Sequence, residues 1–195
     1  MIVDLEEAVA AQPRRLLRGR FWHQGATQRS LEEFADPART AGRYHVAGGT
    51  GVWYASNQEQ AAWAELLRHF VAEGVDPFEV RRRVGHVDVD GMKVLDLTEP
   101  SIVSTLEATI SAGFEGIVAP SAALAGRTTL VVFSSGMHAV NAGPSRVRQP
   151  PPRMADLLTA IRVHRDVPGV VKGMLRFISV GGREAIRRLR QGGSR

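Results

Sequence analysis

The chain has 195 residues, 44% of them hydrophobic and 23% charged, which is the size and composition of one globular domain. It contains no cysteine, which excludes structural disulfides and cysteine-ligated zinc or iron–sulfur sites. Lys93 and Lys172 are the only lysines among 25 basic residues, and the formal net charge is +5. Such an arginine-rich chain suits a phosphate-bearing ligand, a nucleic acid or an acidic partner, and a GC-rich genome also produces this composition.

The N-terminal segment has the wrong charge order for a secretory signal. Asp4, Glu6 and Glu7 precede the first arginines, whereas a signal begins with positive charge. No run reaches the roughly 18 apolar residues that a transmembrane helix needs. We therefore expect a cytoplasmic protein that does not bind a membrane.

The first quarter of the chain predicts short elements separated by loops. Residues 1–17 are expected to form a helical arm that ends at Pro13. Residues 18–23 (RGRFWH) have the aromatic content of a strand, and residues 30–34 open with a capping box that predicts a short helix. Glycines and polar residues predict that residues 39–51 form a loop around a short strand.

A strand and a long helix are expected next. Residues 51–56 (GVWYAS) are typical of a strand. Asn57 and Gln60 form a second capping box, which predicts a helix that runs to Glu73 and stops at Gly74. One stripe of this helix is expected to face the core, namely Trp63, Leu66, Leu67 and Phe70.

Shorter elements are expected in the rest of the chain. These are strands at 80–89 and 93–97 joined by a turn at Asp90-Gly91, a helix at 100–112, strands at 116–118 and 128–133, a helix at 153–164, a strand at 174–180 and a basic helix at 183–190. The mixed order, without regular β–α–β alternation, predicts an α+β fold. We expect the domain to span residues 18–180, between the arm at 1–17 and a basic tail at 181–195.

Several common site motifs are absent from the sequence. Residues 48–51 (GGTG) precede a predicted strand instead of a helix, so they do not form a dinucleotide-binding fingerprint. There is no HExxH and no GxSxG, and the six histidines show no metal-ligand spacing. We therefore expect no metal site.

A more specific pattern is spread over four segments. They are residues 42–45 (GRYH), 52–55 (VWYA), 62–65 (AWAE) and 116–122 (GIVAPSA). Tyr54 and Glu65 stand eleven residues apart. In order and spacing these segments resemble the RES domain family, which is named for its arginine, glutamate and serine. Where family members often have GRWNP, this chain has GRYHV at residues 42–46.

The resemblance implies a fold similar to ADP-ribosyltransferase toxins and an enzyme that degrades NAD⁺ by cleaving its nicotinamide–ribose bond. NAD⁺ would be the substrate, water or inorganic phosphate would attack, and no further cofactor is implied. The implied partner is a helix-turn-helix antitoxin of the Xre type, with DNA bound only through that antitoxin. A homodimer is left open.

The same resemblance implies a role for each candidate residue. Glu65 would stabilise the positive charge that develops on the ribose, and Ser121 would hold Glu65 in place. Tyr54 would stack on the nicotinamide ring, and Arg43 would bind the pyrophosphate. The further substrate-binding candidates are Arg20, Phe21 and His45.

Other interpretations of these residues stay open. Glu65 paired with Arg68 or His69 would be an ordinary helix surface, and Ser121 would simply cap a turn. The alternative functions are transfer of ADP-ribose onto a protein, an inactive scaffold, and a basic nucleic-acid-binding module. The sequence shows no helix-turn-helix pair in support of the last.

Overall fold

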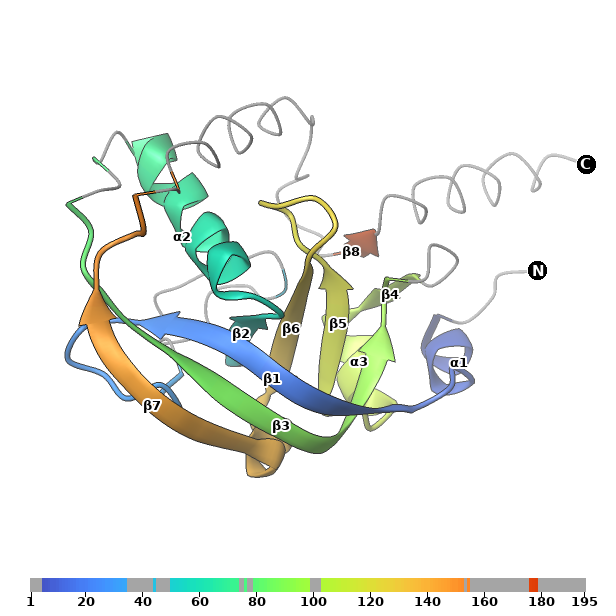
Figure 1. Ribbon diagram of the computed structural model, residues 1–195. Coiled ribbons are helices and arrows are strands. Elements are labelled where there is room, and N and C mark those ends of the chain that lie inside the picture. The colour runs from blue at the N-terminus through green and yellow to red at the C-terminus, as the bar shows by residue number, and fades with distance from the viewer. Residues whose placement is uncertain are drawn as a thin grey trace, which may run out of the picture.

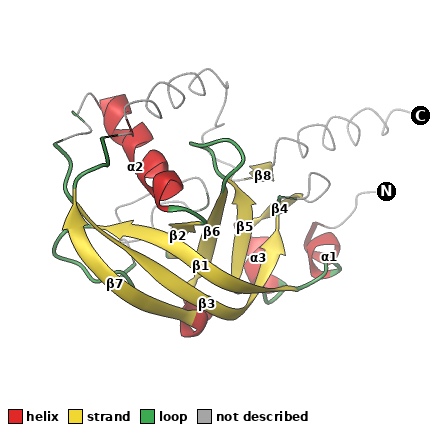
Figure 2. Cartoon of the chain, viewed as in Figure 1, coloured by secondary structure: helices red, strands yellow, loops and turns green. Residues whose placement is uncertain are grey.

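A computed structural model describes residues 5–34, 44, 50–73, 76, 79–98, 103–152, 154 and 176–178. They form a small α+β domain in which a mixed, strongly curved sheet carries helices on its outside (Figures 1 and 2). The elements are α1 (Leu5–Ala10), β1 (Arg15–Gly25), β2 (Val52–Ser56), α2 (Glu59–Glu73), β3 (Arg82–Asp96), β4 (Val103–Thr105), α3 (Leu106–Ser111), β5 (Gly116–Pro120), β6 (Thr128–Phe133), the 3-10 helix η1 (Ser134–Ala139), β7 (Val140–Arg148) and β8 (Arg176–Ile178). Among these described elements, no helix has the length and apolar content needed to cross a membrane.

The main sheet closes on itself through the pairing of β1 with β3. Its strand order is β1-β2-β6-β5-β3-β7, and β1 also pairs with β3 along its whole length. β3 runs parallel to β5 and antiparallel to β1 and β7. One edge of β3 therefore pairs with β1, while the other edge pairs first with β7 and then with β5. Figure 1 shows these long strands crossing the shorter β2, β5 and β6 steeply.

Apolar side chains fill the inside of the ring and cover part of its outside. Phe21, Trp53 and Val87 belong to the inner cluster, to which every strand of the ring contributes. A second cluster, which includes Phe114 and Ile117, lies on the outer face beneath α1 and α3. The two faces of each strand are thus assigned to different clusters, as strand alternation requires.

Helix α2 covers a third apolar cluster on the outer face. The predicted stripe is confirmed where it is described, because three of its members are buried: Trp63, Leu66 and Leu67. The side chain of Phe70 lies outside the described residues. Ala61, Ala62 and Ala64 are buried as well, and these small side chains let other segments approach the helix closely.

The predicted turn at Asp90-Gly91 is wrong, because β3 continues through it. Leu17 pairs with Met92 and Arg18 pairs with Asp90, so both halves of β3 lie against the same strand. Gly91 is the extra residue of a β-bulge, and its φ of +75° is a left-handed conformation that suits glycine. A hairpin would have required the two halves to pair with each other.

Two further expectations differ from the structure. Residues 30–34 contain a turn and no helix, and the helix expected from residue 100 begins at Leu106, after β4. Strand β7 was not predicted at all. It lies at the sheet edge, most of its side chains are exposed, and it contains Pro144, so it lacks an apolar alternation.

The remaining expectations are confirmed or fall outside the described residues. β2, β5 and β6 lie where strands were predicted, and β8 falls within the strand expected at 174–180. The helix predicted at 153–164, apart from Met154, and the helix at 183–190 lie outside the described residues. The division into arm, domain and tail stays a prediction, although β1 already begins at Arg15.

Replacing Gly91 with alanine is expected to lower the free energy of unfolding by about 1–2 kcal/mol, the usual cost of a left-handed L-residue. A Cβ at Gly91 would meet no atom within 4 Å, so the loss reports backbone conformation alone. Gly91→Asn should lose less, because asparagine tolerates this region better. Urea unfolding measures both variants, and wild-type stability in Gly91→Ala would contradict the assigned bulge.

Candidate active site

One row of residues crosses the outer face of four neighbouring strands. Trp22 of β1 pairs with Ser56 of β2, Ser56 pairs with Thr129 of β6, and Thr129 pairs with Ala119 of β5. Directly paired residues point to the same face of a sheet, so these side chains share one face. Helix α2 begins shortly after β2 and carries Glu65 to this row.

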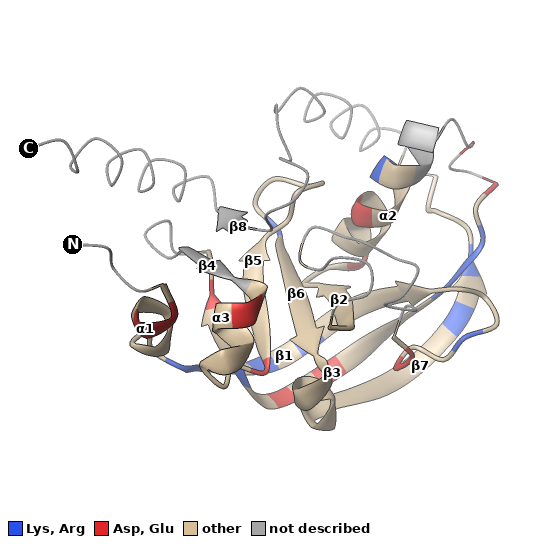
Figure 3. Ribbon diagram, turned by 180° about the vertical axis from the view of Figure 1, so that it is seen from behind, with Lys and Arg blue, Asp and Glu red and all other residues tan. Residues whose placement is uncertain are grey.

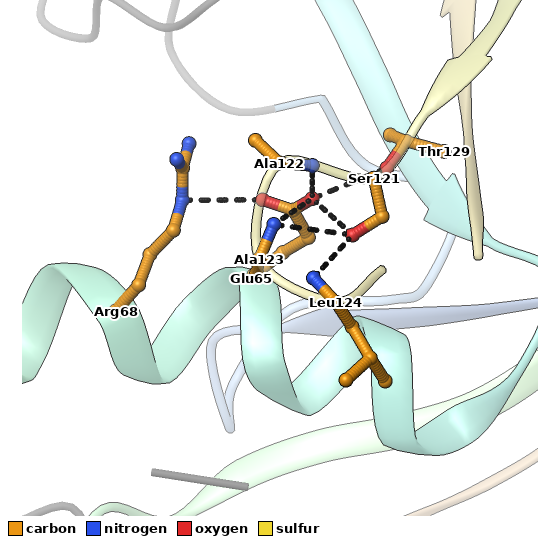
Figure 4. Close-up of polar contacts among 7 residues, drawn as sticks. All are labelled: Glu65, Arg68, Ser121, Ala122, Ala123, Leu124 and Thr129. Carbon is orange, nitrogen blue, oxygen red and sulfur yellow. Dashed lines mark hydrogen bonds and ion pairs between the residues drawn. The ribbon is translucent and has the colours of Figure 1, made fainter. Parts of the chain in front are cut away.

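Glu65 is the most heavily hydrogen-bonded side chain of this face (Figure 4). Its Oε1 accepts from Ser121 Oγ at 2.7 Å and from the backbone amide of Ala122 at 2.8 Å. The amide of Ala123 and the hydroxyl of Thr129 add longer contacts of 3.3 and 3.4 Å. The side chain is only 21% exposed, so this oxygen is held by the protein instead of by water.

The other oxygen of the carboxylate has a different environment. Arg68 Nε lies 3.1 Å from Glu65 Oε2, as an ion pair one helical turn apart. The expected surface pairing with Arg68 is therefore present, but it involves only Oε2. Glu65 thus has one oxygen fixed by four donors, while its second oxygen pairs with the single cation of Arg68.

Ser121 performs both of the roles considered from the sequence. Its hydroxyl donates to Glu65, and its Oγ accepts from the amides of Ala123 and Leu124 at 3.2 and 3.1 Å. The serine therefore caps the turn after β5 and anchors the carboxylate at the same time. The same turn contains the amides of Ala122 and Ala123 that bind Glu65. The shape of the turn and the position of Glu65 therefore depend on each other.

The start of α2 is tied to the same strand pair. The predicted cap Asn57 accepts from the amide of Thr128 through Oδ1 at 3.1 Å, and its own N–H donates to the Thr128 carbonyl at 3.1 Å. These bonds attach the chain before α2 to the beginning of β6. Asn57 consequently fixes the helix against the strand that carries Thr129.

Tyr54 lies on β2 two residues before Ser56, so it belongs to the same outer face. Its hydroxyl accepts from the backbone amide of Tyr44 at 3.3 Å, and the two rings are 6.2 Å apart with an interplanar angle of 38°. Tyr54 is half-buried and packs against the outer cluster. The structure thus places two of the sequence candidates, Tyr54 and Glu65, on one face.

His23 is a residue that the sequence-based site assignment did not include. Its Nδ1 lies 2.5 Å from the carbonyl oxygen of Tyr54, and its ring stacks on Trp53 at 4.3 Å. Burial lowers the pKa of His23 to about 4, with a smaller contribution from Arg82. The imidazole is therefore neutral near pH 7, and its Nδ1–H donates to Tyr54.

The other sequence candidates are placed differently. Arg20 is exposed, and its Nε donates to Asp88 at 2.8 Å. Asp88 raises the pKa of Arg20 through this hydrogen bond, so the guanidinium stays charged. Phe21 is 6% exposed inside the ring, on the opposite face of β1, so its ring does not reach the face of Glu65. Arg43 and His45 lie outside the described residues.

Thr129 and the amides of Ala122 and Ala123 were also missed from the sequence. A buried threonine within an apolar strand is a signal that could have drawn attention to Thr129. Backbone amides carry no sequence signal. Across the described ranges, no cluster of three or more histidine, aspartate or glutamate side chains is placed to hold a metal ion.

The chain is similar to known proteins in sequence and in fold. A family profile described as RES domain matches residues 12–112. The chain is 47% identical over 207 aligned positions to a probable NAD(+) phosphorylase of Mycobacterium tuberculosis, covering 97% of this chain and all of that protein. Its fold is similar to one chain of the M. tuberculosis MbcT–MbcA toxin–antitoxin complex, with a TM-score of 0.58 and 18% identity, covering 82% of this chain and 97% of the other.

Protonation of His23 is expected to destabilise the fold in acid. Its pKa is about 4 in the folded protein and 6.5 unperturbed, so the unfolded chain binds the proton more tightly. The free energy of unfolding should therefore fall as the pH drops from the unfolded towards the folded value. His23→Gln keeps an N–H donor and cannot titrate, so its loss over this interval should be smaller. Urea midpoints measure both proteins, and parallel pH profiles would contradict the assignment.

Proposed function

This chain belongs to the RES domain family, and on that premise we propose that it is a toxin enzyme that degrades NAD⁺ by phosphorolysis of the nicotinamide–ribose bond. The observation that carries the proposal is the Glu65 carboxylate, which four donors anchor through Oε1 while Oε2 pairs with Arg68. The sequence similarity to the probable phosphorylase of M. tuberculosis supports phosphate as the attacking group. Phosphate is then a co-substrate, and no cofactor is required.

The proposed reaction exchanges one bond at the anomeric carbon of the ribose. The carbon–nitrogen bond breaks, its electron pair leaves with nicotinamide, and positive charge develops on the ribose ring. A phosphate oxygen then bonds to that carbon, which yields nicotinamide and ADP-ribose 1-phosphate. Because the leaving nicotinamide is neutral, the reaction makes little demand on a general acid.

Glu65 is suited to stabilise this transition state. Its Oε2, which pairs with Arg68, would face the developing cation, whereas its Oε1 is held by Ser121, Thr129 and two amides. A carboxylate that cannot rotate away is preorganised for the charge that forms, which is the largest contribution in many enzymes. Tyr54, on the same face, would stack on the nicotinamide ring.

The remaining substrate contacts are assigned by the resemblance to the family. Arg43 and His45 are proposed to contact the pyrophosphate and the ribose. Arg20 shares the outer face of β1 with Trp22 but is already engaged by Asp88, so we give it a secondary role. Phe21 is left out, because its ring is packed inside the core.

We further propose that a partner protein controls this activity. The structurally similar chain belongs to a toxin–antitoxin complex, which supports an antitoxin as the partner. The proposed antitoxin is a helix-turn-helix protein of the Xre type, which would carry any DNA contact. A fold similar to that of ADP-ribosyltransferase toxins and action in the cytoplasm belong to the same proposal. The number of subunits is left open.

Glu65→Gln is expected to lower the turnover of NAD⁺ at least about 100-fold, the usual loss for one electrostatic group of a preorganised site. Glutamine is nearly isosteric and keeps an acceptor for Ser121, so the fold should persist. Release of nicotinamide is followed with and without inorganic phosphate. Glu33→Gln, which removes an exposed carboxylate paired with Arg29, is the matched control.

The products decide between the proposal and its alternatives. ADP-ribose 1-phosphate that forms only with phosphate supports the phosphorylase, whereas free ADP-ribose indicates hydrolysis. Nicotinamide release that requires an added protein would favour an ADP-ribosyltransferase. Full turnover in Glu65→Gln would remove the carboxylate from the mechanism.

Ser121→Ala is expected to lower kcat about 10-fold and to leave the KM for NAD⁺ nearly unchanged, because Glu65 loses its closest donor. Ser121→Thr keeps the hydroxyl and should restore most of kcat. Steady-state kinetics of the two variants test this positioning role. Equal losses of kcat in both would contradict the positioning role, because Ser121→Thr retains the hydroxyl that binds Glu65.

A further inference from the structure

The face that carries Glu65 continues across β1 into a basic region. Gln24 lies two residues beyond Trp22 on the same face of β1, and it pairs with Val84 of β3. On the far side of β3, Val84 pairs with Arg146 and Arg82 pairs with Arg148. Arg82, Arg146 and Arg148 therefore share the face of Trp22. Figure 3 shows basic positions gathered where β3 begins and β7 ends.

A cavity of about 410 Å³ opens at this place. Its lining combines the half-buried indole of Trp22, the guanidinium of Arg148, the carboxylate of Glu59 and the amide side chains of Gln58 and Gln60, with Pro151 and Met154 as apolar walls. The volume lies in the range of small-molecule sites, and four of the seven lining residues are polar or charged. The aromatic ring suits a flat base, and the amides suit its hydrogen-bonding edge.

The arginines of the cavity and of its surroundings differ in how they are paired. Arg148 is balanced by Glu59, whose Oε1 lies 2.6 Å from its Nη1. Arg82 donates to the neutral Gln24 at 2.8 Å, and within the described ranges neither Arg82 nor Arg146 lies at ion-pair distance from a carboxylate. Burial, followed by the charge of Arg29, lowers the pKa of Arg82. Like charges placed opposite each other on neighbouring strands destabilise a sheet, and a bound phosphate would relieve that repulsion.

The cavity lies within reach of the carboxylate site. Trp22, Ser56 and Thr129 occupy successive strands of one row, so Trp22 and Thr129 are about 10 Å apart at the usual strand spacing of about 4.8 Å. Gln58 of the cavity lies on the same helical face as Glu65, about 10 Å along the axis at about 1.5 Å per residue. One dinucleotide can therefore contact both places.

We propose that this cavity binds the adenylate half of the dinucleotide, with adenine against Trp22 and the adenylate phosphate facing Arg148. This inference rests on the proposed function, because it assigns the second half of the same substrate. It divides the site into a reactive end at Glu65 and a binding end at Trp22. Binding energy from the adenylate would then hold the ribose at the reactive end.

AMP and nicotinamide mononucleotide, which each contain one half of NAD⁺, separate the two ends. AMP is expected to bind the wild-type protein directly in calorimetry. The double variant Arg148→Gln/Glu59→Gln removes the cavity cation together with its partner, so no charge is left unpaired. It should weaken AMP binding about 10-fold, the effect of one hydrogen bond to a charged group, and raise the KM for NAD⁺ equally with kcat preserved.

The mononucleotide supplies the internal control. Its KM and kcat should be the same in the wild type and the double variant, because it lacks the adenylate. Arg18→Gln, which removes an exposed arginine paired with Asp90, is the matched variant and should leave AMP binding unchanged. Trp22→Leu keeps an apolar side chain and should weaken AMP more than ribose 5-phosphate, since only AMP carries the base.

The outcomes distinguish the inference from the proposed function. Failure of AMP to bind, or an equal change in KM for NAD⁺ and the mononucleotide, would overturn the adenylate site. AMP binding that is lost in the double variant supports the site even when neither nucleotide releases nicotinamide. That last result would contradict the proposed function alone. Protection of the cavity by a partner protein, without AMP binding, would assign the cavity to that partner and overturn the inference.

Discussion

The structure depends on the use of both edges of β3. One edge pairs with β1 over its full length, and the other is divided between β7 and β5. This double pairing closes the sheet, gives it an interior that side chains can fill, and leaves the outer face for helices. β2 lies between β1 and β6, so the row from Trp22 to Ala119 crosses four paired strands. The candidate site is built on regular strands and one helix, which hold side chains more firmly than loops do.

The two oxygens of the Glu65 carboxylate have different environments. The protein satisfies Oε1 with side-chain and backbone donors from a single turn and one neighbouring strand. Oε2 has a single charged neighbour among the described residues, the guanidinium of Arg68 at 3.1 Å. Removal of the substrate would therefore leave the carboxylate in place, and the reorganisation that accompanies charge development would be small. His23 contributes at a distance, because it holds the carbonyl of Tyr54 and so fixes β2.

The sequence predicts the local elements of this protein better than their connections. Glu65, Tyr54 and Ser121 could be selected because their order follows a family pattern, and the apolar stripe of α2 is visible in its spacing. β7 could not be predicted, since an exposed edge strand carries no alternation. Asp90-Gly91 has the local chemistry of a hairpin turn, and only the distant pairing with β1 decides against it. The amides that bind Glu65 and the basic cluster across β3 and β7 likewise depend on register, which a single sequence does not reveal.

The bulge at Gly91 changes which residues of β3 point into the ring, from odd-numbered to even-numbered ones. After it, the even-numbered Val94 points into the ring, whereas before it the odd-numbered Val87 does. If the same residues formed one regular alternation without the bulge, the first half of the strand would turn over. Val87 would then face solvent, while Asp88 and Arg82 would face the apolar interior. The placement of apolar side chains inside and charged side chains outside therefore depends on one extra residue in β3, Gly91.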